Sequence, residues 1–383
     1  MVLNQVSLHR PSKSFLHRKI YSELLSAISQ GRYVEGQRLP SEAQLVRQFK
    51  ASRPTVTRAL QELQHEGVVE RRAGSGTFVR QAKSRQGYLF GLFVHKLGET
   101  EIFDPICREL VKSAQSSGHS VLWSATDAAE STEREIEAIC AQYVDRKVSG
   151  IFLAPVEVDA HATQINQHLL ASLERAKIAV VLLDRDFYEY PARSPYDLVG
   201  IDNRRAGFLA ADHLLELGCR RIAFLHRPNS AETVRSRISG YTDALLMHDV
   251  PANPQLICEG DPSDESLVRQ LVRDHQVDSV ICANDLTAAM LMNTLDNLGV
   301  RIPQEIRIVG IDDVRYASLL RVPLTTVHQP CGAIGRNAVL AMVERLANPQ
   351  MPSRDIRLQG HLVIRKSSGA DLKKSQPAKM KST

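Results

Sequence analysis

Residues 52–60 read SRPTVTRAL, and this stretch, between RLPSE at 38–42 and RRAGSGTFV at 71–79, decides how the amino-terminal part of the chain folds. Ser52 suits the N-cap of a helix, and Pro54 then falls in the first helical turn, where its missing N–H does no harm. Apolar residues recur with helical spacing and predict a buried stripe of Val56, Ala59, Leu60 and Leu63. The opposite face carries Arg53, Thr57 and Gln61, with Arg58 beside them. The stretch therefore predicts a helix that presents guanidinium and hydroxyl groups to solvent.

The segments on either side of this helix complete a compact unit. Ser41 and Gln44 fit a capping box at the start of a preceding helix. Residues 68–70 and 77–79 are predicted to form two short strands around a glycine-containing turn. Gly76 would let that turn come close to a sugar-phosphate backbone.

A pair of helices followed by a basic hairpin predicts a DNA-binding module. The major groove of duplex DNA accepts an α-helix, and an arginine can pair with guanine there through two parallel hydrogen bonds. The alternative is an ordinary helical surface with solvated charges, but the added Gly-x-Gly hairpin favours DNA binding. The residues that we expect at the DNA are Arg38, Ser41, Ser52, Arg53, Thr55, Thr57, Arg58, Arg72 and Gly76.

This segment, roughly residues 15–80, resembles the winged helix-turn-helix of the GntR family. The resemblance implies that Arg53, Thr55 and Arg58 touch DNA, together with the wing around Gly76. Ala43 stands where some members of the family carry a DNA-contacting arginine, and Thr57 replaces another frequent arginine. The resemblance therefore does not specify the operator sequence.

Charge is unevenly distributed along the 383 residues, although the net charge is only +5. Residues 1–83 hold 14 Lys and Arg against 6 Asp and Glu, whereas residues 84–365 hold 29 against 36. A basic head on an acidic body predicts a polyanionic partner for the head alone. The apolar fraction of 43% suffices for a sizeable core, and the length predicts two or three domains.

We find no motif for a metal, a cofactor or catalysis in the sequence. The six cysteines form no Cys-x-x-Cys pair, and the thirteen histidines are dispersed. Gly-x-Ser-x-Gly, His-Glu-x-x-His and a lysine-containing phosphate loop are all missing. There is also no signal-peptide pattern and no apolar run long enough to span a membrane. We therefore expect a cytoplasmic, nucleoid-associated protein with no catalytic residues, no metal, no cofactor and no membrane partner.

Beyond residue 87, short apolar stretches alternate with amphipathic ones. The expected strands are 88–94, 120–124, 149–154, 178–184, 198–201, 221–226, 279–283 and 306–311. The expected helices are 104–117, 131–146, 161–176, 203–217, 232–247, 263–275, 286–298 and 332–347. Alternating strands and helices predict doubly wound parallel sheets, and the length predicts two lobes. The expected domains are a DNA-binding domain at 1–80, a linker at 81–87, an effector-binding and dimerisation domain at 88–368 and a disordered basic tail at 369–383.

Polar residues follow several of these strands. Ligands of open α/β sheets bind beyond the carboxyl ends of the strands, and carboxylates and amides there suit a polyhydroxylated or amine-bearing small molecule. The residues that we expect to contact such a ligand are Asp184, Arg237, Asn284 and Asp312. For Asp202, Asn203 and Asp285, helix capping or a hinge role is at least as good an interpretation.

Residues 87–368 resemble the effector domain of the LacI/GalR regulators, a type I periplasmic-binding-protein fold. Stretches that carry the resemblance include GIFLAP at 150–155, CAND at 282–285 and VGIDD at 309–313. The resemblance implies two lobes that are joined by three crossovers and close on ligand. It places ligand contacts at Asp184, Arg237, Asn284 and Asp312.

Two departures from this family concern aromatic stacking. Pro262 and Cys331 stand where several members place a ring against the ligand. Candidates for a remaining ring are Phe103, Trp123, Phe187 and Tyr188, and we include Phe103 in the expected effector site.

The combined resemblance, a GntR-like head on a LacI-like body, is similar to the arabinose-repressor subgroup. The expected fold is a winged helix-turn-helix (α+β) joined to a two-lobed α/β domain. We expect a ligand-responsive repressor of sugar uptake or catabolism genes that binds a palindromic DNA operator as a homodimer. A small-molecule effector, expected to be a carbohydrate, would release or tighten this binding. The alternatives are a solute-binding protein or sensor without sequence-specific DNA binding, against which the basic head argues, and an enzyme.

Overall fold

The computed structural model describes residues 13–29, 32–34, 36–65, 67–72, 75–79, 87–94, 101–123, 133–157 and 162–371. The chain divides into two compact units, Met1–Gln86 and Gly87–Thr383, which we call the amino-terminal and carboxy-terminal units. Within the expected linker only Gly87 is described, and most of the expected tail, from residue 372 onward, also lies outside the described residues.

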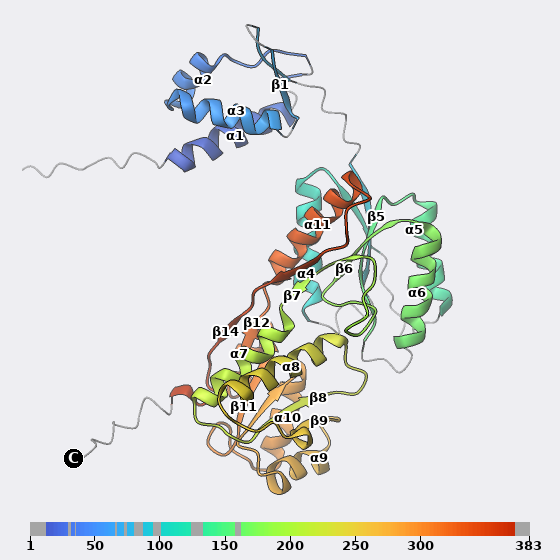
Figure 1. The fold of residues 1–383 in the computed structure, drawn as a ribbon, viewed down its shortest axis with the longest axis vertical. Helices are drawn as coiled ribbons and strands as arrows, with labels where there is room; N and C mark the ends of the chain where they lie inside the picture. The colour runs from blue at the N-terminus through green and yellow to red at the C-terminus, as the bar shows by residue number, and fades with distance from the viewer. Residues whose placement is uncertain are drawn as a thin grey trace, which may run out of the picture. The chain divides into compact units, whose positions relative to one another are not determined.

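The amino-terminal unit consists of three helices and a two-stranded hairpin (Figure 1). Its elements are α1 (Lys13–Ser29), α2 (Glu42–Phe49), α3 (Arg53–His65), β1 (Val69–Arg72) and β2 (Gly76–Val79). The predicted capping box is present, since the Ser41 hydroxyl accepts from the N–H of Gln44 and the Gln44 side chain accepts from the N–H of Ser41. The predicted stripe on α3 is fully buried at Val56, Ala59, Leu60 and Leu63. It packs with residues of α1 and α2, among them Ile20 and Leu45, into one core.

The carboxy-terminal unit contains two six-stranded sheets, each the centre of a lobe. The first lobe has strand order β13-β7-β6-β5-β3-β4, with all neighbours parallel. Its strands are β3 (Leu89–Val94), β4 (Ser120–Trp123), β5 (Gly150–Ala154), β6 (Ala179–Leu183), β7 (Asp197–Ile201) and β13 (Asp355–Leu358). Its helices are α4 (Phe103–Ser116), α5 (Glu133–Asp145), α6 (Ala162–Ala176) and α11 (Cys331–Ala347).

The second lobe has strand order β14-β12-β11-β10-β8-β9, in which only the β12–β14 pair is antiparallel. Its strands are β8 (Ile222–His226), β9 (Ile257–Glu259), β10 (Ser279–Cys282), β11 (Arg307–Asp312), β12 (Thr325–His328) and β14 (His361–Val363). Its helices are α7 (Asn203–Glu216), α8 (Glu232–Met247), α9 (Glu265–Arg269) and α10 (Asp285–Asn297), with η1 (Pro254–Leu256), η2 (Gln270–Asp274) and η3 (Arg315–Ser318) as single turns.

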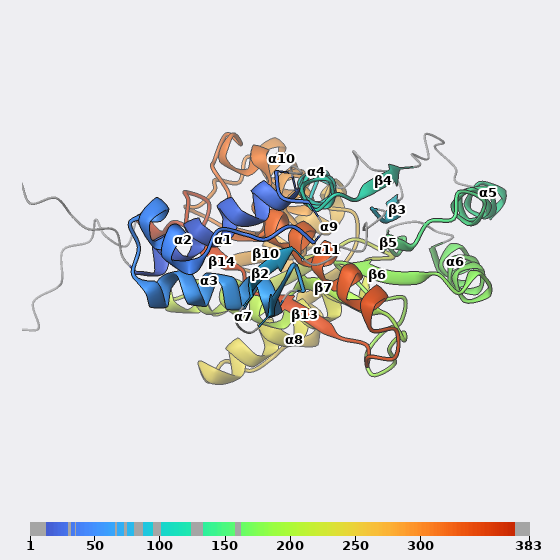
Figure 2. The same cartoon turned by 90° about the horizontal axis from the view of Figure 1, so that it is seen from above.

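Both faces of the first sheet are covered by helices. Figure 2 shows β3, β4, β5 and β6 between α5 and α6 on one side and α4 and α11 on the other. Along β3, Phe90, Leu92 and Val94 pack into the core that contains α4 and α11, whereas Phe93 packs with α5 and α6. This alternation explains why the strand is apolar throughout, as expected of a parallel strand buried on both faces.

The chain crosses between the sheets three times, as the family resemblance implies. The crossings follow β7, β12 and β13. Prediction from the sequence missed four strands as such: β9, β12, β13 and β14. All four are three or four residues long, and three of them, β9, β13 and β14, are sheet edges, where the apolar signal is weak.

Candidate nucleic-acid interface and ligand cavity

The outward face of α3 is available to a partner. The Arg53 side chain is 82% exposed, Arg58 is also exposed, and Thr55 and Thr57 are half-buried. Ser52 is exposed, and its hydroxyl lies 2.8 Å from the Thr55 hydroxyl, so that these two side chains bond to each other at the helix start. The helix therefore has the predicted division between a buried apolar stripe and a polar, cationic face.

The hairpin places further cations beside Gly76. Gly76 has a φ of +116°, and a Cβ at this position would lie 2.6 Å from Nε of Arg38. Arg38 is bridged to Phe78 of β2, and the guanidinium of Arg72 lies 4.9 Å from the centre of the Phe78 ring. Only glycine suits both the backbone conformation and the close approach of Arg38.

Glu42 connects the three parts of this surface, which the sequence did not lead us to expect. Its carboxylate accepts from Nε of Arg53 at 3.2 Å and from the guanidinium of Arg71. Glu42 thus links the first turn of α2 to the start of α3 and to β1. Its position in a first helical turn, where acidic residues are common for electrostatic reasons, gave no sign of this role.

The carboxy-terminal unit contains a cavity of about 250 Å³ lined from both lobes. All four polar residues that we expected at a ligand line it: Asp184, Arg237, Asn284 and Asp312. Phe103, the fifth, was a wrong prediction. It is fully buried, lies among the core residues and not in the cavity lining, and packs 5.1 Å beneath the guanidinium of Arg185.

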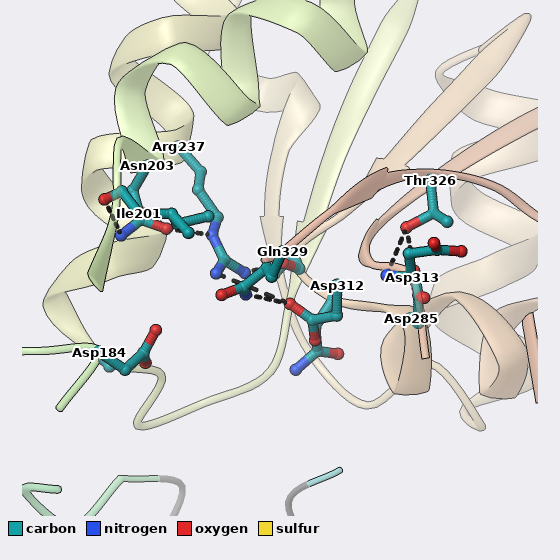
Figure 3. Close-up of polar contacts among 12 residues, drawn as sticks. Asp184, Ile201, Asn203, Arg237, Asp285, Asp312, Asp313, Thr326 and Gln329 are labelled. Carbon is teal, nitrogen blue, oxygen red and sulfur yellow. Dashed lines mark hydrogen bonds and ion pairs between the residues drawn. The ribbon is translucent and has the colours of Figure 1, made fainter. Parts of the chain in front are cut away.

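Arg237 is held at the centre of this site. Its Nε donates to Oδ1 of Asn203 at 2.8 Å, and another nitrogen donates to the carbonyl of Ala283. Its remaining terminal nitrogen lies 3.9 Å from Oδ1 of Asp312 (Figure 3). The close packing of α7 on α8 makes this possible, because a Cβ at Gly207 of α7 would lie 1.9 Å from the Arg237 carbonyl. Asn203 therefore positions the arginine from the first crossover.

Asp184 follows directly after β6 and combines an unusual backbone conformation with a buried carboxylate. Its φ is +69°, and its side chain is buried. Oδ2 lies 3.3 Å from the Arg185 guanidinium, whereas Oδ1 is buried without a hydrogen-bond partner. Burial raises the pKa of this carboxyl, and Arg185 and Arg237 offset only part of the effect. An unpaired buried acceptor at a cavity indicates a place for a donor from a ligand.

Asp312, the last residue of β11, shares with Asp184 a positive φ and a raised pKa. Its φ is +132°, and burial raises its pKa well above the usual value although Arg237 opposes the shift. Nε2 of Gln329 donates to its Oδ1 at 2.6 Å, which leaves Oε1 of Gln329 buried without a partner.

Asn284 and Asp285 have mainly structural contacts. Asn284 caps α10 by accepting from the N–H of Thr287 at 2.9 Å, although it also lines the cavity. Asp285 accepts from the Thr326 hydroxyl and from the N–H of Val314, and burial raises its pKa to about 6. The capping interpretation considered for Asp202 is confirmed, since its carboxylate accepts from the N–H of Arg205.

Several residues of the site were missed. Arg185 lines the cavity and donates to the Pro155 carbonyl at 2.7 Å and to Glu157. Gln329 lies in the second crossover, just after a strand that we had not predicted. The adjacency of Arg185 to Asp184 was the one signal available in the sequence. In the part of the chain that the structure describes, no three potential metal ligands converge and no helix could span a membrane.

Comparisons with known proteins agree with this two-part architecture. The model of the family "Bacterial regulatory proteins, gntR family" matches residues 16–79, and that of the "Periplasmic binding protein-like domain" matches residues 211–368. An arabinose metabolism transcriptional repressor of Geobacillus stearothermophilus is 26% identical over 362 residues, which are 91% of this chain and 96% of the relative. An HTH-type transcriptional repressor PurR of Aliivibrio salmonicida is 26% identical over 322 residues, 82% and 91% of the two chains.

Solved structures show the same fold. A complex of the transcriptional regulator CelR with cellobiose superposes with a TM-score of 0.63 and 23% identity, covering 94% of this chain and all of that one. The lac repressor dimer bound to operator and the anti-inducer ONPF gives a TM-score of 0.61 with 22% identity, covering 75% of this chain and 96% of that one.

The fold and the two sites define a ligand-responsive, DNA-binding transcriptional regulator. Its chain combines a GntR-type winged helix-turn-helix with a two-lobed periplasmic-binding-protein-like domain, the organisation that it shares with the arabinose metabolism repressors.

Proposed function

We propose that this regulator is a repressor whose cavity binds a small neutral carbohydrate, and that this binding changes its affinity for an operator. The observation that carries the proposal is the convergence of Asp184, Arg237 and Asp312 on one cavity. One buried acceptor of its lining, Oδ1 of Asp184, has no hydrogen-bond partner. Each unpaired buried polar group costs about 1–3 kcal/mol, so hydroxyl donors of a ligand would offset a substantial penalty.

The lining of the cavity argues against two other ligand classes. Carboxylates outnumber guanidinium groups in it, with Glu101, Glu157, Asp184 and Asp312 against Arg185, Arg227 and Arg237. A phosphorylated ligand would therefore meet net repulsion. Among the described lining residues there is no aromatic ring, so a flat heteroaromatic base would find nothing to stack on. A compact polyhydroxylated molecule fits both observations, and the names of relatives and neighbours mention arabinose, ribose and cellobiose.

At the DNA, the exposed face of α3 supports base recognition by the first turns of that helix. We assign Arg53 and Arg58 to base edges, since both guanidinium groups are exposed on this face. The remaining predicted contacts are assigned to the sugar-phosphate backbone: Arg38, Ser41, Ser52, Thr55, Thr57, Arg72 and Gly76. Two copies of the chain would place two such helices on the half-sites of a palindrome. The protein acts in the cytoplasm, on the nucleoid, and without catalysis of its own.

A binding assay with fluorescent duplex DNA, selected in vitro for tight binding to the full chain, tests this function. Adding D-arabinose, D-ribose, D-xylose, D-glucose or cellobiose should change the affinity for that DNA by roughly 5–150-fold for at least one sugar. Asp312→Ala should abolish the response and keep DNA affinity, whereas Asp274→Ala, at an exposed carboxylate outside the cavity, should leave both unchanged. The proposal fails if the chain selects no DNA sequence, or if no sugar alters either DNA binding or the melting temperature.

A further inference from the structure

A second cavity adjoins the first and is also lined from both lobes. It measures about 370 Å³ and shares five lining residues with the inner cavity: Pro155, Val156, Glu157, Arg185 and Ser230. Its other walls come from α6 and the segment after β6, in the first lobe, and from the start of α8, in the second. The two cavities therefore lie side by side in the same cleft, and we call the second one the outer cavity.

Arg185 forms the boundary between the two cavities. Its guanidinium bonds to Asp184 of the inner cavity at 3.3 Å and to Glu157, which lines both. The other carboxylate oxygen of Glu157 accepts from the N–H of Ala231, a residue of the outer cavity, at 3.2 Å. A ligand in the inner cavity that contacts Arg185 is therefore separated from the outer cavity by this side chain.

The outer cavity differs from the inner one in its chemistry. It contains two aromatic rings, Phe187 and Tyr188, and the exposed amide of Gln167. Tyr188 is 40% exposed, so that its ring is open to a ligand. A ring of this kind packs against the apolar face of a sugar, while amide and carboxylate groups bond to its hydroxyls.

The charge of the outer cavity disfavours an anionic group, although Arg235 pairs with one of its carboxylates, Glu189, at 2.7 Å. Among its described lining residues Arg185 is the one cation, and it is already engaged by Asp184 and Glu157. The carboxylates of Asp186, Glu189 and Glu232 line the same space. A phosphate or carboxylate placed there would meet acidic neighbours without a free positive partner.

We propose that the outer cavity binds the second, uncharged unit of a two-unit effector, such as a disaccharide or a glycoside, with Tyr188 as its stacking surface. The size of the cavities supports this, since the inner cavity alone lies below the range of about 300–1,000 Å³ usual for ligand pockets. The inner cavity then holds one polyhydroxylated ring on Asp184, Arg237 and Asp312. This inference rests on the proposed carbohydrate function and makes it more specific.

Isothermal titration of the full chain with matched sugar pairs tests the inference. Suitable pairs are glucose with cellobiose, xylose with xylobiose, and galactose with lactose. For at least one pair the two-unit sugar should bind at least about 10-fold more tightly than its single unit. Tyr188→Ala should remove most of that advantage and leave the affinity for the single unit unchanged. Tyr190→Ala is the matched control, because Tyr190 lies in the same segment, is 86% exposed and lines neither cavity.

The outcomes separate this inference from the function on which it rests. If single sugars bind and change DNA affinity while their two-unit forms bind no better, the outer cavity has no such role and the repressor function stands. Equal losses for both members of a pair in Tyr188→Ala would also overturn the inference, since they indicate a structural role for the ring. If no sugar of either size binds, the carbohydrate proposal fails together with it.

Discussion

Replacing Asp184 with asparagine should make the ligand-free protein more stable and at the same time weaken effector binding. The side chain is buried, Oδ1 has no hydrogen-bond partner, and burial outweighs the attraction of two arginines, so that the pKa of the carboxyl is raised. The folded protein thus carries this charge at a net cost. Asparagine has nearly the same shape, can still accept from Arg185, and carries no charge.

The expected size of the effect follows from the contacts that change. Relieving a poorly compensated buried group stabilises the fold by about 1 kcal/mol or more, which corresponds to a rise of about 2 °C in the melting temperature of a unit of this size. A hydrogen bond from a ligand hydroxyl to a charged acceptor contributes about 1.5–3 kcal/mol. Its loss should therefore weaken the effector roughly 10- to 150-fold.

The gain in stability should depend on pH in a defined direction. The pKa of Asp184 in the folded protein lies above its value of about 3.9 in an unfolded chain. Below both values the carboxyl is protonated in both states and costs nothing. As pH rises through the folded-state pKa, the folded protein must bury a charge, so the wild type loses stability relative to Asp184→Asn. The advantage of the variant should therefore be smaller near pH 4 than at pH 7.

Thermal unfolding of wild type and Asp184→Asn, each at several pH values and without ligand, measures this difference directly. Asp285 and Asp312 are present in both proteins, so their titration largely cancels in the comparison. A variant that is less stable at pH 7, or a difference that does not change with pH, would show that Asp184 is a stabilising ion-pair partner. In that case its unpaired oxygen would be no argument for a ligand.

Two further predictions concern the amino-terminal unit. Arg53→Ala and Arg58→Ala should each weaken binding to selected DNA by about 1–3 kcal/mol and to random DNA much less, as measured by fluorescence anisotropy. Arg301→Ala, a 73% exposed arginine of the other unit, should change neither; equal losses on both DNAs would reassign Arg53 or Arg58 to phosphates. Gly76→Ala should reduce DNA affinity more than Gly67→Ala, because both residues have positive φ but only at Gly76 would a Cβ collide with Arg38. Equal effects in the two variants would mean that strain alone, and not the position of Arg38, matters.

Most of the architecture could be predicted from the sequence because local signals and burial agree along most of the chain. The capping box at Ser41, the buried stripe of α3 and the strands that are apolar on both faces were all legible from spacing alone. The general rule that ligands of open sheets bind beyond the carboxyl ends of strands was enough to select Asp184 and Asp312, which both line the cavity. The four strands that we missed, β9, β12, β13 and β14, are too short for a recognisable alternation of apolar residues.

The errors in the site have a different origin, because they concern contacts between residues far apart in sequence. Gln329 reaches Asp312 from a crossover, and Glu42 reaches Arg71 across 29 positions. Neither residue type is unusual where it stands, so no local pattern singled it out. The prediction for Phe103 was wrong because its local pattern was ambiguous. An aromatic residue near a strand end can contact a ligand or pack in the core, and Phe103 is fully buried in the core beneath Arg185.

The unfavourable burial of carboxylates in the cavity explains how a small ligand controls this protein. A ligand shifts an equilibrium between open and closed lobes only by the difference between its affinities for the two states. Asp184 belongs to the first lobe and Asp312 to the second, so a ligand can bond to both only when the lobes are closed. Burial raises the pKa of both carboxyl groups, so closing the lobes over their charges without a ligand costs free energy.

Direct hydrogen bonds between the lobes stabilise the closed state. The Tyr316 hydroxyl of the second lobe donates to Glu101 of the first at 2.9 Å, and the N–H of Ala231 donates to Glu157 at 3.2 Å. Each is a single hydrogen bond to a carboxylate, whose net contribution is about 1.5–3 kcal/mol. Since these contacts offset the cost of the buried carboxylates, the open and closed states should differ by only a few kcal/mol. A ligand that donates to the unpaired oxygen of Asp184 then supplies enough differential affinity for the coupling of about 1–3 kcal/mol that allosteric regulators typically show. Filling the cavity with well-packed apolar residues would remove both the cost of the buried carboxylates and the ligand's hydrogen bonds to them. The domain would then be stable but would no longer respond to the effector.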